Sequence, residues 1–111
     1  MKNKVELLKY PNFQCVHFYC PGCGERHELP VVGDSSKMPV WGWNQSLHSP
    51  TLTPSILARF PKWHRGENSE LPQDMICHSF VTDGRIQFLG DCTHELANQT
   101  VDLPDLEEAI S

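Results

Sequence analysis

Two cysteines separated by a proline and a glycine are the residues in this sequence whose spacing points most directly to chemistry. Cys20 and Cys23 flank Pro21-Gly22, and a turn of this composition can bring both thiolates to one metal ion. A tetrahedral zinc site needs four nitrogen or sulfur ligands, usually supplied as two pairs far apart in the sequence. The segment therefore predicts half of a zinc site, and the other half must come from elsewhere in the chain.

The second half is predicted in a β-hairpin near the C-terminus. Asp83-Gly84 is typical of a two-residue type I′ turn, and it divides the segment 75–91 into two strands. In that register Cys77 faces Gly90, so Cys92 is its diagonal neighbour on the same face, near enough for both side chains to reach one ion. The predicted zinc ligands are Cys20, Cys23, Cys77 and Cys92. A bulge after Gly90 would change the fourth ligand to His94, or to His78.

The same hairpin carries side chains suited to acid–base chemistry. His78 and Asp91 are expected on the face opposite to Cys77, and His94 follows closely. A lone histidine is more often a structural residue than a catalytic one, so no catalytic residue is assigned. If the protein is an enzyme, His78, Asp91 and His94 are the candidates, acting beside a zinc-bound water in a hydrolase or transferase of small molecules or nucleotides.

Short alternating segments separated by proline and glycine predict the elements that position these residues. The expected strands are 13–20, 26–32, 49–60, the two hairpin strands within 75–91, and 100–103; one helical turn is expected at 93–98 and a short helix at 104–110. Segment 61–74 is expected to be a surface loop. The fold class is mostly β, a small zinc-stapled antiparallel sheet or two-sheet sandwich with a short C-terminal helix. Residues 1–111 are expected to form a single domain.

Composition narrows the classes of partner and compartment. Fourteen acidic against nine basic residues give a net charge of −5, which disfavours broad binding to nucleic acids or anionic membranes. No signal peptide or membrane span is expected, and five cysteines without a secretory signal indicate the cytoplasm of the host cell. A weaker alternative is single-stranded nucleic-acid binding through Trp41, Trp43 and the cluster 59–65.

Taken together, several blocks resemble a known family over nearly the whole chain. The blocks are Cys20-Pro-Gly-Cys23-Gly, Trp41-Gly-Trp43-Asn44, Pro54-Ser55-Ile56, Cys77-His78-Ser79-Phe80 and Asp91-Cys92-Thr93-His94. They are similar to a small domain of unknown function, frequent in tailed phages and prophages, that often carries the label ammonia monooxygenase. Ammonia monooxygenases are membrane-embedded copper enzymes, and this sequence has neither a membrane span nor a copper-type histidine cluster. We therefore do not expect that activity.

The resemblance implies a phage- or prophage-type zinc-binding protein. Related sequences can have serine at the position of Cys92, which favours His94 or His78 as the fourth ligand. The expected function is that of a protein-interaction module with a structural zinc, whose partner is a host or phage protein.

Overall fold

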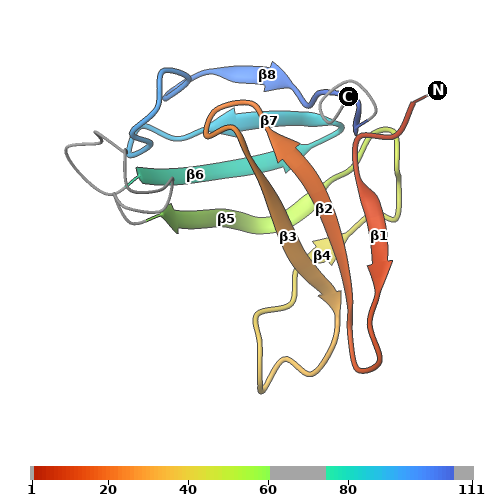
Figure 1. Ribbon diagram of the computed structural model, residues 1–111. Coiled ribbons are helices and arrows are strands. Elements are labelled where there is room, and N and C mark those ends of the chain that lie inside the picture. Colours follow the sequence, from red (N-terminus) through yellow and green to blue (C-terminus); the bar gives the residue numbers. More distant parts are fainter. Residues whose placement is uncertain (1, 61–74, 107–111) are drawn as a thin grey trace.

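The computed structural model describes residues 2–60 and 75–106. Within them the chain forms eight strands, coloured along the sequence in Figure 1. Their bounds are β1 Glu6–Lys9, β2 Gln14–Cys20, β3 Glu25–Val32, β4 Gly42–Trp43, β5 Leu52–Phe60, β6 Met75–Thr82, β7 Arg85–Phe88 and β8 Thr100–Asp102. The expected mostly-β class is confirmed.

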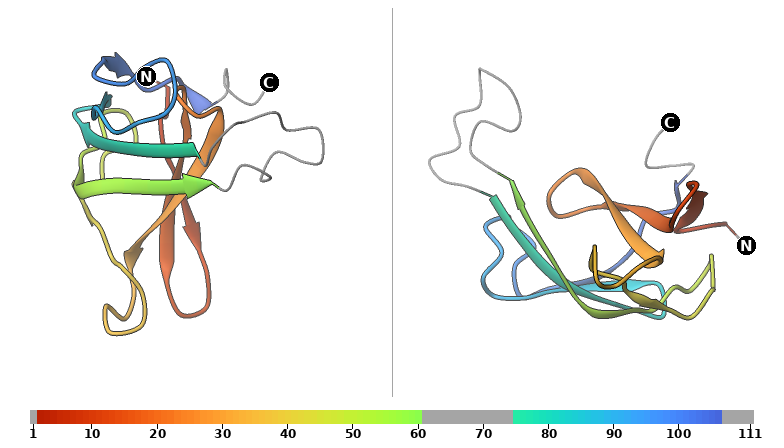
Figure 2. Two further views of the ribbon diagram at one scale, coloured as in Figure 1. Left: turned by 90° about the vertical axis from the view of Figure 1, so that its left-hand side faces the viewer. Right: turned by 90° about the horizontal axis from the view of Figure 1, so that it is seen from below.

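The strands form two antiparallel sheets that pack on each other. A three-stranded sheet has the order β1-β2-β3, and a five-stranded sheet has the order β4-β5-β6-β7-β8. Figures 1 and 2 show β2 and β3 crossing the face of the larger sheet at a steep angle. Buried side chains of both sheets, among them Phe18, Ile56 and Phe88, form one core between them.

The first sheet is built around β2, which pairs with β1 on one edge and β3 on the other. Most of its side chains are buried, as is typical of a central strand. Pro30 lies in β3, an edge strand of this sheet, as its missing N–H requires. Strand β1 was not predicted, and its Leu7 and Leu8 are only half-buried.

The hairpin of β6 and β7 has the predicted register. Thr82 pairs with Arg85 around Asp83 and Gly84, and both turn residues have positive φ, as a type I′ turn requires. The regular ladder ends at Phe88, and a tight turn follows in which the Cys92 N–H donates to the Leu89 carbonyl. The predicted pairing of Cys77 with Gly90 is therefore not part of the regular ladder, and this turn stands in its place.

Strand β5 is irregular where the sequence places Pro54. The register with β6 shifts between Leu52 and Ile56, and the Thr53–Pro54 peptide bond is cis. Pairing is regular from Ile56 onward, with Leu57 opposite His78. A proline suits such an irregular position, because it has no N–H to donate to the ladder.

Three expected elements differ or fall outside the description. Segment 93–98 forms turns rather than a helical turn. The C-terminal helix is not seen, since the described residues end at Leu106, and the expected loop 61–74 lies outside them too. No membrane-spanning helix occurs in the part of the chain that the structure describes.

Candidate catalytic and metal sites

Three side chains meet on the outer face of the larger sheet, the face turned away from the core. Ser55 comes from β5, His78 from β6, and Asp91 from the turn after β7. Cys77, Ser79 and Val81 are buried on the inner face of β6, so alternation places His78 outward. Leu57 faces His78 across the ladder, and Ser55 is the next residue of β5 with the same orientation.

The three residues are joined in a line by hydrogen bonds. Ser55 Oγ lies 3.2 Å from His78 Nε2, while His78 Nδ1 lies 3.0 Å from Asp91 Oδ2 and 3.3 Å from Asp91 Oδ1. The carboxylate accepts a hydrogen from Nδ1, so Nε2 is left as the nitrogen that can accept the serine proton. A hydroxyl, an imidazole and a carboxylate in this order form the arrangement of a Ser–His–Asp triad.

The side chains of His78 and Asp91 are partly exposed, so a substrate can reach the site. The His78 side chain is 25% exposed and that of Asp91 is 53% exposed. Two bulky apolar side chains, Leu57 and Phe80, are exposed beside His78 on the same face. The site is an open surface of the sheet rather than a buried polar network.

Cys92 holds the Asp91 turn against the backbone of His78. Its sulfur lies 3.2 Å from both the backbone nitrogen and the carbonyl oxygen of His78. Burial raises the pKa of the Cys92 thiol, so it stays protonated and can accept from the N–H while its S–H donates to the carbonyl. Both triad partners of His78 are thus held next to β6. Ser55 is held by the pairing of β5 with β6, and Asp91 is held because the adjacent Cys92 binds the backbone of His78.

A second group of residues lies on the other face of β6, between the two sheets. Cys20, Cys23, His27 and Cys77 are all buried, and one possible ligand atom from each lies within 4.8 Å of the others. Cys20 Sγ is 3.5 Å from Cys77 Sγ, and Cys23 Sγ is 3.4 Å from His27 Nε2. Hydrogen bonds from Cys23 and Cys77 lower the pKa of the Cys20 thiol. These are the donors that a tetrahedral metal site with three sulfurs and one nitrogen requires.

The other predicted fourth ligands are placed differently. Cys92 and His94 form a separate group with Cys77, apart from Cys20 and Cys23, while His78 contacts Ser55 and Asp91. His94 Nδ1 accepts a hydrogen bond from the Leu96 N–H at 3.2 Å, which leaves the proton on Nε2. Nε2 of His94 is buried and has no hydrogen-bond partner among the described residues, so His94 stays an alternative ligand. The structure therefore contains buried Cys/His groups that could hold a metal ion, as the sequence predicted. The identity of the metal and the fourth ligand stay predictions.

Of the triad, sequence reasoning named His78 and Asp91 and missed Ser55. It had placed His78 and Asp91 on the face opposite to Cys77, and His78 is indeed on that face. Ser55 stood in the Pro54-Ser55-Ile56 block and on an expected strand. No signal in the sequence paired that strand with β6, because fourteen residues outside the described ranges separate the two strands. His94, the third candidate, packs its ring against Phe88 away from the triad.

The triad defines the class of a serine hydrolase, and a comparison with protein families points to the same class. Residues 2–89, well over half of the chain, match the family BubE, described as the serine protease of a bacterial ubiquitination-like system. The chain belongs to this family. Ser55 and His78 lie inside the matched segment, and Asp91 follows it by two residues. No curated protein and no solved structure matches the chain.

The family match corrects the expected function. The expected function, that of a non-enzymatic interaction module, was wrong, and so were its alternatives of a zinc-dependent hydrolase or transferase and a single-stranded nucleic-acid binder. Much of the basic cluster invoked for nucleic acid, from Lys62 to Arg65, also lies outside the described residues. A bacterial ubiquitination-like system agrees with the expected protein partner. The resemblance to a phage and prophage domain is not tested by these comparisons.

Proposed function

We propose that this protein is a serine protease in which Ser55 is the nucleophile, His78 the general base and Asp91 the residue that orients His78. The observation that carries the proposal is the position of His78, with one ring nitrogen 3.2 Å from Ser55 Oγ and the other 3.0 Å from Asp91. The family description supports peptide-bond hydrolysis, and it supports a substrate protein that belongs to the same ubiquitination-like system.

The mechanism follows from this order of groups. Ser55 Oγ attacks the carbonyl carbon of the scissile peptide bond while His78 Nε2 takes the hydroxyl proton. The tetrahedral intermediate collapses, the C–N bond breaks, and His78 gives its proton to the departing amine. Water then attacks the ester on Ser55 with His78 again as base, which releases the acid and returns the proton to Ser55. Asp91 stabilises the imidazolium that forms in both steps.

A substitution pair tests the assignment. A mixture of peptides prepared from a bacterial proteome is incubated with each variant, and new termini are identified by mass spectrometry. Ser55→Ala should reduce cleavage by roughly 10⁶-fold. Ser79→Ala should leave it unchanged, because Ser79 is buried on the opposite face of the sheet. Equal cleavage by Ser55→Ala and the intact protein would refute the proposal.

We further propose that the cluster of Cys20, Cys23, His27 and Cys77 binds zinc. Three thiolates and one imidazole suit zinc, and four protein ligands leave no position for a reacting water. Cys20, Cys23 and His27 belong to the β2–β3 hairpin, whereas Cys77 lies on β6, so the ion would join the two sheets. It would also anchor Cys77, the residue directly before His78.

Metal content and X-ray absorption test the zinc site. One zinc per chain is expected, with three sulfur and one nitrogen ligand. Replacing His27 should then lower the zinc content, while Cys92→Ala should leave it unchanged. A shell of four sulfurs, or zinc that depends on Cys92, would contradict this ligand set.

A further inference from the structure

Among the described residues, the edge of β5 that carries the proposed nucleophile is only partly paired with another strand. On the side away from β6, β4 pairs with Leu52 and Thr53 alone, and no other described strand pairs with that edge. Figure 1 shows β4 lying against the first part of β5 while the rest of the strand continues beyond it. Ser55 stands where the covered part of the edge ends.

The backbone of Ser55 faces this open edge. The Trp41 indole N–H donates to the Ser55 carbonyl at 3.3 Å, so that carbonyl points away from β6. Backbone directions alternate along a strand, and Leu57 and Arg59 therefore present their N–H and C=O groups to the same edge. Such a row of groups is a template for pairing with an extended peptide.

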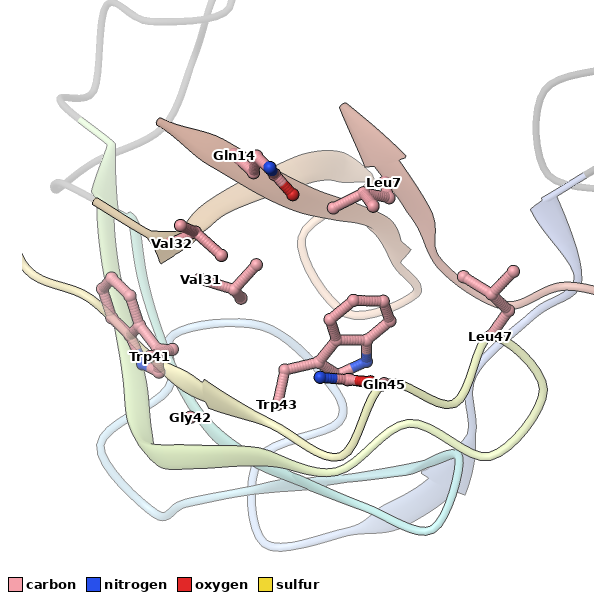
Figure 3. A pocket seen from close by; sticks show the side chains of 9 residues that line it. All are labelled: Leu7, Gln14, Val31, Val32, Trp41, Gly42, Trp43, Gln45 and Leu47. Carbon is pink, nitrogen blue, oxygen red and sulfur yellow. The ribbon is translucent and has the colours of Figure 1, made fainter. Parts of the chain in front are cut away.

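A pocket lies beside this edge, on the inner side of the larger sheet. It has a volume of about 400 Å³, and its walls come from both sheets and from the segment after β4. Figure 3 shows the indole rings of Trp41 and Trp43 and the side chains of Val31 and Leu7 lining it, with Gln14 and Gln45 as the polar members. Its walls are mainly apolar, and its size suits one bulky side chain.

The pocket and the nucleophile share one residue. Trp41 lines the pocket and also donates to the Ser55 carbonyl, so a group in the pocket lies close to the segment that presents Ser55. Side chains of an extended strand alternate between its two faces. A peptide paired along β5 would direct one side chain inward to this pocket and its neighbours outward, past Leu57, which is 61% exposed.

We propose that the substrate is an extended polypeptide segment that adds as a strand to the open edge of β5 and places one bulky apolar side chain in the Trp41–Trp43 pocket. The pairing brings a substrate carbonyl beside Ser55, and the pocket selects the residue at one fixed distance from the bond that is cut. This inference rests on the proposed protease function and adds the class of substrate.

The cleavage profile of the intact protein tests the pocket. In the peptide mixture described above, cut sites should share an apolar residue at one fixed position. Val32→Lys places a charge at the pocket rim, where Val32 is 53% exposed and its loss should not disturb folding. This variant should lower kcat/KM for such peptides at least tenfold, mainly through KM. Tyr10→Lys changes an exposed apolar residue outside the pocket lining and should leave the profile unchanged.

Backbone methylation of the best peptide tests strand addition. In a paired strand, every second backbone N–H of the peptide points toward β5. Methylation of one of these nitrogens should abolish cleavage, whereas methylation of a nitrogen that points away from β5 should have little effect. A profile without a fixed apolar position, or equal effects at all nitrogens, would overturn the inference. Labelling of the intact protein by a fluorophosphonate separates the two proposals. If the protein is labelled but its cut sites share no apolar residue, the pocket alone is refuted. If the protein is not labelled, the protease function itself is refuted.

Discussion

At the scale of single residues, the contact between His78 and Asp91 is expected to set the rate of the chemical step, kcat. Asp91 is half-exposed, so water competes for its carboxylate more than in a buried triad. Asp91→Asn keeps the shape of the side chain but removes the charge that stabilises the imidazolium. We expect kcat to fall by roughly 10²–10⁴-fold with little change in KM. Steady-state kinetics measure both, and a loss confined to KM would contradict the assigned role.

The Cys92 thiol is the residue that we expect to position the Asp91 turn. Cys92→Ala removes two contacts to the backbone of His78, each worth about 1 kcal/mol. The expected result is a fall in kcat of about tenfold, with partial recovery in Cys92→Ser, whose hydroxyl can replace both contacts. Cys15→Ala is the matched control, because Cys15 is also a buried free cysteine but belongs to neither Cys/His group. An equal loss in both variants would indicate a general effect on folding instead.

The same scale shows what could be read from the sequence. The Cys20–Cys23 spacing and the Asp83-Gly84 turn are local signals, and they predicted the metal-type cluster and the hairpin that carries Cys77 and His78. Ser55 depends on a strand pairing between segments far apart in the chain, which no local pattern specifies. His27 was not among the predicted metal ligands, although its place in β3 opposite Phe18 brings it to the cluster.

At the scale of elements, the Cys20–Cys23 turn packs against the turn that contains His94. A Cβ built on Gly22 would overlap the His94 ring, which is itself held against Phe88. Gly22→Ala should therefore destabilise the protein by about 1–3 kcal/mol. Chemical denaturation measures the change. Gly33→Ala is the comparison, since its nearest neighbour is the flexible Met38 side chain at 3.2 Å, and it should cost less.

The proposed zinc ion would link the two sheets, so removal of the metal should act on both stability and activity. Chelation should lower the midpoint of thermal unfolding by more than about 10 °C, since metal binding contributes directly to the folding free energy. Activity should fall as well, because Cys77 adjoins His78 on β6. Calorimetry and peptide cleavage before and after re-addition of zinc measure both. An unchanged midpoint in protein verified as metal-free would contradict the proposed clamp.

At the scale of the whole molecule, the two faces of one strand serve two different purposes. The inner face of β6 contributes Cys77 to the cluster between the sheets, while the outer face presents His78 to solvent. A fold of two small sheets therefore places a stabilising centre directly behind a reactive one. The mostly-β architecture was predictable from alternation and turn residues. The pairing of β5 with β6, which forms the triad, and the crossing of the two sheets, which forms the Cys/His cluster, are long-range properties.

The most direct test of the central claim is the reaction of the protein with a fluorophosphonate, mapped by tandem mass spectrometry. Such reagents modify a serine only when a neighbouring base activates it. We predict one adduct, on Ser55, formed by the intact protein and by Ser79→Ala but lost in His78→Ala. Failure of the folded protein to react, or an adduct on another serine with none on Ser55, would contradict the triad.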